Sequence, residues 1–376
     1  MKRHGNIYDK ICSIENLREA HRNARKDKLF YKEVQMVDSN PDYYLTQIQE
    51  MLSSETYEVS EYTYSVINDK GKSRDLAKLP YFPDRIIQWA IMLQIEPVFM
   101  ETFCYHTCAS IKQRGISRVV DLMHEYLKDT KNTTYCFKMD VSKFYPSIDH
   151  DILKKLLRKK FKDKRLLKLL DKIIDSAITE TGVPIGSYLS QYLANFYLSY
   201  FDHWMKEELH LKYVVRYMDD IVVLSSSKLH LHIVQAQVKQ YLNTELNLTI
   251  KPNYQIFPVE KRGIDFVGFR FYHGKTLLRK STYKKMKRKM RKILKKQMKN
   301  QLINYSEFCS INSYAGWLKL CDGYRLSQKY IIPVIPSLLR YYKEIILGNS
   351  KKSPIKKENA FIKYKENLIK KGLLQE

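Results

Sequence analysis

The sequence predicts an α+β fold in which an antiparallel sheet is flanked by helices, and three observations support this. The chain has 376 residues, of which 44% are hydrophobic and 12% aromatic, so it can bury a substantial core divided among two or three subdomains. Segments with apolar residues at helical spacing alternate with short β-rich runs. Two of these runs, 213–217 and 221–225, flank the tight corner YMDD and are predicted to form a strand, turn and strand.

The first quarter of the chain is predicted to be mostly helical. Residues 1–60 carry apolar residues at helical spacing and should form short helices. The stretch 57–67, YEVSEYTYSVI, alternates as a strand does and ends at the turn signal 68–71. A further helical block is expected after the pair Asp84-Arg85.

The central part is predicted to combine strands with longer helices. Residues 135–141 should form a strand that leads through a turn into a helix at 149–160. The apolar run 189–209 after Pro184 predicts one long helix, and 228–246 predicts another.

The charge of the chain points to a polyanionic partner. The formal net charge is +26, more than solubility requires, and nucleic acid is the first expectation, with a lipid surface or a general basic bias as alternatives. Ten of the twenty residues in 281–300 are Lys or Arg and none is acidic. Like charges four residues apart repel each other on a helix, and a phosphate backbone would neutralise them. A strand pair at 263–272 is expected before this segment and a helical region around 315–320 after it.

Several classes of protein are disfavoured by the sequence. The N-terminus has basic residues but no apolar core of a signal peptide, and no run reaches the roughly 18 apolar residues of a membrane span. We therefore expect a cytoplasmic protein with no membrane partner. The cysteines lack paired CxxC spacing, so neither a zinc ribbon nor a disulfide framework is supported. They are Cys12, Cys104, Cys108, Cys136, Cys309 and Cys321.

Three aspartates in β-rich surroundings are candidate metal ligands. Asp140 ends an apolar strand, and Asp219 and Asp220 lie between the apolar runs VV and IVVL. An isolated Asp is more often a helix cap or turn residue, but burying two acids without partners is costly, and metal coordination removes that cost. Joining a nucleotide to a 3′-hydroxyl requires a deprotonated hydroxyl and a neutralised pyrophosphate. Two Mg²⁺ ions about 3.5–4 Å apart, held by carboxylates, supply both.

Three blocks around these aspartates resemble the reverse transcriptases, in the order and spacing of that family. FKMDVSKFYPSIDHDIL (137–153) is similar to the first catalytic block, and GVPIGSYLSQYLANFYLSYFD (182–202) to the primer-and-template helix block. RYMDDIVVL (216–224) is similar to the signature hairpin. The resemblance covers roughly residues 60–325. It implies an RNA-directed DNA polymerase with a right-hand fold of fingers, an antiparallel-sheet palm and a helical thumb.

The same resemblance implies a division of the chain into subdomains. The palm would carry the catalytic blocks, with part of the fingers interleaved at 150–182. The expected subdomains are an N-terminal helical extension at 1–60, fingers at 61–135, the palm at 136–280, and a basic helical thumb with a C-terminal tail at 281–376.

Roles in the chemistry also follow from the resemblance. Asp140 and Asp219 would ligate both Mg²⁺ ions, with Mn²⁺ as a substitute, while the backbone carbonyl of Val141 helps to bind one ion and Asp220 supports the site. Tyr145 matches the aromatic steric gate that would collide with a ribose 2′-hydroxyl, so a preference for deoxynucleotides is expected. A tyrosine that merely packs in the core is the alternative.

Further residues are assigned to substrates by the resemblance. The segment 68–91 resembles the fingers block, in which Lys72 and Arg74 would bind the incoming triphosphate, although ordinary turn cations are the alternative. Lys251 is a candidate for protonating the pyrophosphate, or else a plain surface lysine. The other nucleotide-binding candidates are Ile185, Gly186 and Gln191. The template- and primer-binding candidates are Arg114, Ser190, Tyr217, Met218, Gly268, Lys284, Lys285 and Arg288.

The helix block indicates which kind of reverse transcriptase this is. Ile185 and the pair Ser190-Gln191 form an IGxxxSQ pattern that resembles the enzymes of diversity-generating retroelements, whereas retroviral and group II intron enzymes typically have Gln where Ile185 stands. In that group the apolar residue is associated with poor fidelity opposite template adenine, because Ile cannot hydrogen-bond the nucleotide. Phage-defence reverse transcriptases are a close rival, and a non-catalytic RNA-binding scaffold is an alternative of another class. The implied partners are an RNA template, a DNA or RNA primer, deoxynucleoside triphosphates, and a small basic accessory protein or a structured non-coding RNA.

Overall fold

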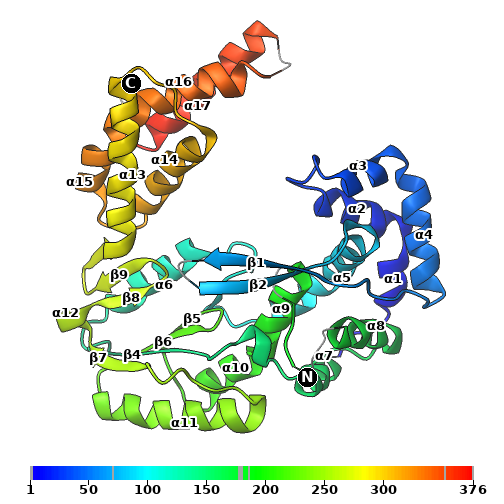
Figure 1. The fold of residues 1–376 in the computed structure, drawn as a ribbon. Helices are drawn as coiled ribbons and strands as arrows, with labels where there is room; N and C mark the ends of the chain where they lie inside the picture. Colours follow the sequence, from blue (N-terminus) through cyan, green and yellow to red (C-terminus); the bar gives the residue numbers. More distant parts are fainter. Residues whose placement is uncertain (1–2, 70–71, 177–180, 185–186, 351–352, 375–376) are drawn as a thin grey trace. The chain divides into compact units, whose positions relative to one another are not determined.

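The computed structural model contains helices and sheets in each of two compact units (Figure 1). The first unit comprises Met1–Val119 and Tyr135–Ile256, and the second comprises Val120–Thr134 and Phe257–Glu376. Two of the three unit boundaries fall inside α6 (Ile116–Leu127) and β7 (Gln255–Pro258), and the third lies between Thr134 and Tyr135. The predicted α+β class is confirmed. The structure describes residues 3–69, 72–176, 181–184, 187–350 and 353–374.

The first unit begins with four short helices, as predicted for residues 1–60. The Ser13 side chain accepts a hydrogen bond from the Asn16 N–H at the start of α2, and Asn40 caps α4. Helix α2 packs against α5, where the Asn16 side chain donates to the Ala90 carbonyl at 3.1 Å. The helices are α1 (Tyr8–Cys12), α2 (Ile14–Ala24), α3 (Lys32–Ser39), α4 (Pro41–Ser53) and α5 (Ile86–Thr102).

A two-stranded antiparallel ribbon, β1 (Thr63–Asp69) and β2 (Lys72–Lys78), lies between α4 and α5 in the sequence. The strand predicted at 57–67 is wrong over its first six residues. Tyr57 is buried there, and its hydroxyl and the Ser60 N–H both donate to the Asp84 carboxylate, at 2.6 and 3.1 Å, so this segment bonds a side chain and not a strand partner. The short helix η1 (Tyr81–Arg85) then leads into α5 at the predicted place.

A five-stranded sheet in the order β3-β5-β6-β4-β7 forms the centre of the first unit. Strand β3 runs parallel to β5, whereas β6 is antiparallel to both β5 and β4. Helix α11 (Lys228–Leu246) packs against β4 and β6 and covers one face of the sheet (Figure 1). The predicted strands at 135–141, 213–217 and 221–225 are thus confirmed. The strands are β3 (Thr107–Cys108), β4 (Tyr135–Asp140), β5 (Tyr213–Tyr217) and β6 (Asp220–Ser225).

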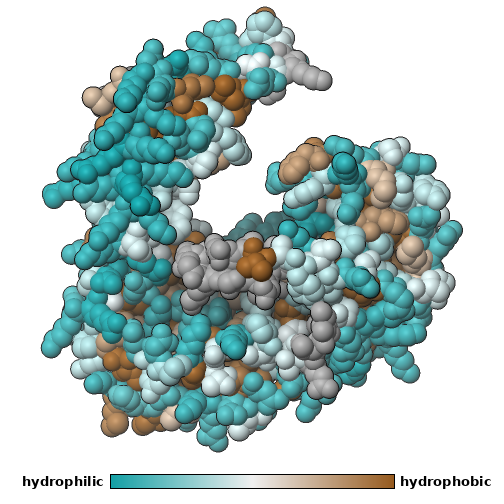
Figure 2. Space-filling model, viewed as in Figure 1, coloured by the Kyte–Doolittle hydropathy of each residue, from teal (hydrophilic) through white to brown (hydrophobic). Residues whose placement is uncertain are grey.

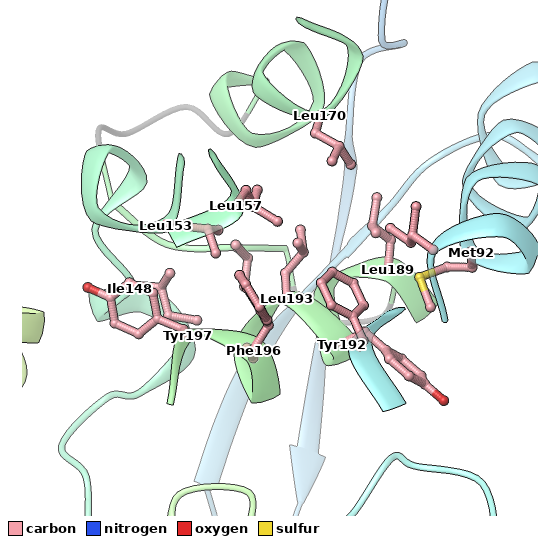
Figure 3. Close-up of a cluster of buried hydrophobic side chains, with 14 of the residues drawn as sticks. Met92, Ile148, Leu153, Leu157, Leu170, Leu189, Tyr192, Leu193, Phe196 and Tyr197 are labelled. Carbon is pink, nitrogen blue, oxygen red and sulfur yellow. The ribbon is translucent and has the colours of Figure 1, made fainter. Parts of the chain in front are cut away.

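The remaining helices of the first unit enclose an apolar cluster. The single helix predicted at 189–209 is wrong, because the chain breaks at Leu198, where the Ser199 hydroxyl donates to the Phe196 carbonyl and competes with the helical bonds. Figure 3 shows Leu157 and Leu193 meeting within the cluster. The elements are η2 (Tyr145–Ser147), α7 (His150–Lys160), α8 (Lys164–Asp175), α9 (Tyr188–Tyr197) and α10 (Ser199–Glu207).

The second unit contains a three-stranded antiparallel sheet in the order β10-β9-β8 and a set of helices. The strand pair predicted at 263–272 is confirmed, and β10 adds a third strand. All six cysteines of the chain are free, as expected. The elements are α12 (Val259–Arg262), β8 (Ile264–Phe266), β9 (Phe269–Tyr272), β10 (Lys275–Leu278), α13 (Lys280–Met298), α14 (Tyr305–Leu318), α15 (Tyr324–Leu326), η3 (Ser327–Ile331), η4 (Ile332–Val334), α16 (Ile335–Tyr341), η5 (Tyr342–Leu347) and α17 (Pro354–Lys370).

Helix α13 carries the basic segment that the sequence singled out. Met286, Met290 and Ile293 are buried at the spacing of one helical face. Lys284 and Arg288 are exposed on the other side, and Figure 2 shows this helix as a hydrophilic surface. Among the described residues, none of the helices combines the length and the apolar composition that a membrane span requires.

Candidate active site

The three predicted aspartates meet at one end of the central sheet. The antiparallel register of β4 and β6 makes Asp140 and Asp220 direct partners. Asp219 lies at the corner of the β5-β6 hairpin, and its carbonyl accepts a hydrogen bond from the Val141 N–H at 3.2 Å. The sheet therefore joins an acid from residue 140 to two acids some eighty positions later.

The corner of the hairpin is a tight turn at Met218. This residue has φ +58°, a left-handed conformation that few residues other than Gly, Asn and Asp adopt. Its N–H donates to the Cys108 carbonyl at 3.3 Å, so the turn is anchored to the end of β3. Tyr217 pairs with Asp220 across the hairpin.

Both aspartates of the hairpin have a raised pKa, so their ionised forms are destabilised. Burial, followed by the charge of Asp140, raises the pKa of Asp219 to about 6. Burial also raises the pKa of Asp220 to about 6, although Lys138, whose ammonium lies 3.4 Å from Asp220 Oδ1, opposes the rise. Such a cluster of partly desolvated carboxylates is the donor set that a hard divalent cation stabilises.

Asp140 has a cationic partner within the chain. Its Oδ1 accepts a hydrogen bond from Lys251 Nζ, and its carbonyl accepts the Lys251 N–H at 2.9 Å. In the part of the chain that the structure describes, no three carboxylate, imidazole or thiol side chains already form a complete metal site. The donor chemistry of the three aspartates fits a divalent ion, and Lys251 places a positive charge beside Asp140.

The ionisation of Tyr145 is influenced by the charge of Asp219. It belongs to η2, and its backbone carbonyl accepts the Val183 N–H at 3.1 Å. Burial and the nearby Asp219 both raise the pKa of its hydroxyl above the usual range. The phenol therefore stays neutral, and the residue is half-buried.

A protein-family model matches residues 67–271, which is more than half of the chain, and it describes a reverse transcriptase (RNA-dependent DNA polymerase). The chain belongs to the reverse transcriptase family. Domains of this family are described as RNA-dependent DNA polymerases, and they generally use divalent metal ions.

Solved structures similar to this reverse transcriptase include telomerases. Apo telomerase from Candida tropicalis has 12% sequence identity and a TM-score of 0.47, and the alignment covers 87% of this chain and 66% of that one. Telomerase from Candida albicans in complex with a TWJ fragment of telomeric RNA has 11% identity, a TM-score of 0.45, and coverages of 89% and 71%. This chain thus spans just under two thirds of the Candida tropicalis protein. A search of the curated proteins finds no match.

The nucleotide-binding candidates are only partly described. Ile185 and Gly186 lie outside the described residues, and Lys72 and Arg74 lie in β2 with side chains that are likewise outside them. Gln191 is half-buried in the first turn of α9. Their contacts with nucleotides remain predictions.

Two template- or primer-binding candidates of the first unit have structural partners. Ser190 is buried, and its N–H donates to the Ser187 hydroxyl at 3.4 Å, which caps α9. The Arg114 guanidinium donates to the Cys104 carbonyl at 2.8 Å and so links the segments before and after β3. These contacts explain the two residues locally, and their contacts with nucleic acid remain predictions.

The candidates of the second unit lie on a turn and on a helix. Gly268 has φ +94° in the turn between β8 and β9, where a Cβ atom would lie 2.4 Å from the ring of Trp317. Only glycine fits there, for reasons of both backbone and space. Lys284, Lys285 and Arg288 project from the exposed face of α13.

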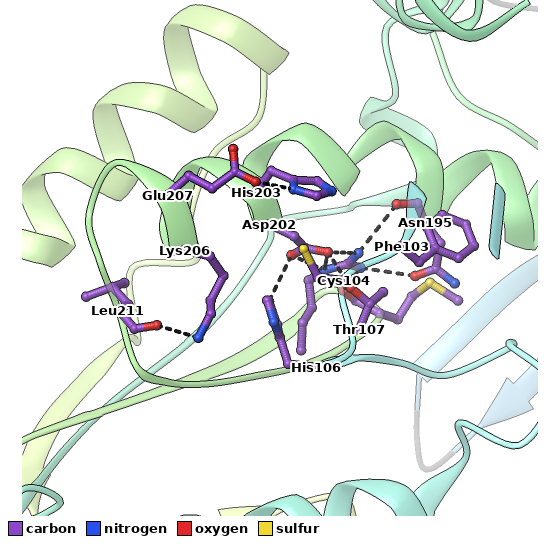
Figure 4. Close-up of polar contacts among 12 residues, drawn as sticks. Phe103, Cys104, His106, Thr107, Asn195, Asp202, His203, Lys206, Glu207 and Leu211 are labelled. Atoms are coloured by element: carbon purple, nitrogen blue, oxygen red, sulfur yellow. Dashed lines mark hydrogen bonds and ion pairs between the residues drawn. The ribbon is translucent and has the colours of Figure 1, made fainter. Parts of the chain in front are cut away.

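Sequence reasoning missed a buried polar network behind the hairpin. The network includes Asp202 of α10, Asn195 of α9 and Thr107 of β3 (Figure 4), and the guanidinium of Arg216 forms an ion pair with Asp202. One signal was available: Arg216 interrupts the apolar strand YVVRY, and a charge in such a strand requires a partner.

Proposed function

We propose that this reverse transcriptase copies an RNA template into DNA by two-metal-ion catalysis at Asp140, Asp219 and Asp220. The observation that carries the proposal is the convergence of the three carboxylates on neighbouring strands, where burial and mutual repulsion raise the pKa of two of them. Burying such a cluster of carboxylates in an apolar sheet is energetically costly, and binding a cation removes that cost.

Two Mg²⁺ ions, or Mn²⁺ in their place, would activate the 3′-hydroxyl and neutralise the leaving pyrophosphate. Asp140 and Asp219 would hold both ions with help from the Val141 carbonyl, and Asp220 would support them. The 3′-hydroxyl attacks the α-phosphorus of the deoxynucleotide, and pyrophosphate leaves. Lys251, whose ammonium contacts Asp140, is our candidate for the group that protonates it.

Substrate selection would depend on residues around these acids. The neutral ring of Tyr145 would exclude a ribose 2′-hydroxyl, and Lys72 and Arg74 would bind the triphosphate. Residues 61–135 would form the fingers and 136–280 the palm. Residues 281–376 would include the thumb, whose basic helix α13 would bind the phosphate backbone of template and primer.

Primer extension tests the polymerase reaction directly. Purified protein should extend oligo(dT) on poly(rA) with Mg²⁺, and EDTA should stop the reaction. Asp219→Ala should abolish extension, whereas Asp151→Asn, at an exposed position of α7, should leave it unchanged. No extension by the wild-type chain would support a non-catalytic RNA-binding scaffold instead. Full activity in Asp219→Ala would refute catalysis at the three aspartates.

We further propose that the enzyme is error-prone opposite template adenine and serves a diversity-generating retroelement. The support is the sequence pattern of Ile185 with Ser190-Gln191, because an apolar side chain leaves the incoming nucleotide less constrained than Gln does. Ile185→Gln should lower misincorporation opposite adenine, and Ile185→Leu should not. An unchanged error spectrum in Ile185→Gln would refute that role.

The biological setting can be tested in cells. Sequencing the cDNA that the enzyme makes would reveal its template and start site. Adenine-directed errors copied from a repeat would support the retroelement role, whereas faithful copies of one structured non-coding RNA would favour phage defence.

A further inference from the structure

A fully buried ion pair lies behind the catalytic hairpin. Arg216 and Asp202 are both completely inaccessible to solvent. Arg216 Nε donates to Asp202 Oδ1 at 2.7 Å, and Nη2 donates to Asp202 Oδ2 at 2.5 Å, which is a two-pronged contact. Figure 4 shows Asp202 at the centre of this network.

The third nitrogen of the guanidinium group, Nη1, bonds the corner of the hairpin. Arg216 Nη1 donates to the Met218 carbonyl at 2.9 Å and to Asn195 Oδ1 at 3.0 Å. Asn195 is in turn held by the Ala109 carbonyl, to which its Nδ2 donates at 3.0 Å. One side chain thus ties α9, α10 and the hairpin corner together.

Stability alone does not account for this arrangement. Desolvating two charges costs about as much as their attraction returns, so an apolar pair of similar volume often serves a core equally well. An apolar side chain at position 216 would fill the space but could not hold the Met218 carbonyl. The geometry of the donors, which only Arg supplies, is the distinctive property.

The Met218 carbonyl belongs to the peptide that leads directly into Asp219. Met218 is held in the left-handed region, which is unfavourable for a residue of this kind. Its N–H is bonded to the Cys108 carbonyl at 3.3 Å, so the peptides on both sides of the corner are anchored. The orientation of the second peptide sets the direction in which the Asp219 side chain leaves the backbone.

We propose that Arg216 is a positioning residue for polymerisation. Held by Asp202 and Asn195, it fixes the main chain at Met218 so that Asp219 and Asp220 face the metal ions. This inference rests on the two-metal reaction proposed above. If Arg216 only joined the sheet to α9 and α10, its loss would lower stability without changing the need for metal.

The test compares two conservative variants that weaken the same network. Arg216→Lys keeps the charge but loses the fork that reaches both Asp202 and Met218. Thr107→Val is the matched control, because the Thr107 hydroxyl donates to Asp202 Oδ2 at 2.6 Å, whereas the Met218 carbonyl is bonded by Arg216. Asp202→Asn is a second test variant in case Arg216→Lys does not fold.

Three quantities are measured in each folded variant: Mn²⁺ binding by electron paramagnetic resonance without nucleotide, kcat with KM for the nucleotide, and the thermal midpoint. We expect Arg216→Lys to bind Mn²⁺ about tenfold more weakly. Its kcat should fall at least about tenfold, because small displacements of reacting groups cost that much, while KM changes less than about twofold. Thr107→Val should lower the thermal midpoint and leave metal binding and kcat unchanged.

Two results would overturn the proposal. One is wild-type Mn²⁺ binding and kcat in the folded Arg216→Lys or Asp202→Asn protein. The other is an equal loss in Thr107→Val at the same thermal midpoint, which would make the network purely structural. Mn²⁺ binding can be measured without turnover, so failure of this proposal can be told apart from failure of the proposed function. A wild-type chain that binds metal but does not extend primers would refute the proposed function instead.

Discussion

Asp220→Asn should make the metal-free protein more stable at neutral pH, although it removes a group from the candidate active site. Burial raises the pKa of Asp220 from 3.8 to about 6, against the opposing charge of Lys138. That rise corresponds to about 3 kcal/mol of destabilisation once the carboxylate is ionised. Because 28% of the side chain is exposed and solvent screens part of its charge, we expect a gain of about 1–3 kcal/mol from the neutral isostere.

The pH dependence fixes the sign of the effect. The folded protein holds the Asp220 proton up to about pH 6, whereas the unfolded chain releases it near pH 4. The penalty is therefore absent below about pH 4, grows as the pH rises through this interval, and is complete above about pH 6. Urea unfolding in EDTA at pH 4 and pH 8 should show equal stabilities at the lower pH and a more stable variant at the higher pH.

Asp163→Asn provides a control of opposite sign. Burial alone would raise the pKa of Asp163, but the backbone N–H groups of Tyr8 and Ile7, at 2.9 and 2.7 Å, outweigh it and hold the pKa below the usual range. This variant should lose stability at pH 8. If Asp220→Asn were less stable than wild type at pH 8 in EDTA, the carboxylate would not be under electrostatic strain and the argument would be wrong. Mg²⁺ should stabilise the wild-type protein and narrow the difference between the two.

The other predictions concern packing, substrate choice and charge. Gly268→Ala should lower the free energy of unfolding by at least about 2 kcal/mol, because an indole ring lies 2.4 Å from the new Cβ. Gly274→Ala, with φ +67° and open space around it, should lower it by about 1 kcal/mol. Equal losses in the two variants would contradict the packing argument. Tyr145→Ala should raise ribonucleotide incorporation by about tenfold or more, and Tyr145→Phe should not, as measured by primer extension with each nucleotide class. Lys285→Gln with Arg288→Gln should lower the slope of log affinity against log salt by about 1–2 in filter binding to template and primer, and an unchanged slope would exclude phosphate contacts by α13.

The catalytic hairpin was predictable because its signals are local. Short apolar runs rich in β-branched residues define β5 and β6, and the corner between them contains Asp219 and Asp220 within a few residues of sequence. Asp140 could be added from the apolar strand that it ends, since the metal chemistry requires acids at strand ends. Each step needed only a short window of sequence and a chemical reason.

The polar network around Arg216 and the contact of Lys251 with Asp140 could not be predicted, because they join parts of the chain that are separated in the sequence. Asp202 resembles an ordinary acid near a helix until Arg216 is placed beside it, and neither position reveals the other. Lys251 meets Asp140 across 111 positions. The break at Leu198 has a local cause, because the Ser199 hydroxyl donates to the Phe196 carbonyl three positions earlier, a side-chain bond that helical periodicity does not encode. Pattern reading detects elements, whereas the polar network and the Lys251 contact require knowing which elements touch.

The contact between Arg216 and the hairpin corner has a consequence for how the YMDD segment can vary. The guanidinium holds the carbonyl oxygen of residue 218, an atom that every amino acid possesses. The side chain at 218 therefore takes no part in the hydrogen bond with Arg216. The residue there must only tolerate a left-handed backbone and fit the space that Met218 fills in the core. Position 218 can accept new side-chain chemistry while the two aspartates beside it keep their register, and directed evolution of this enzyme could use that freedom.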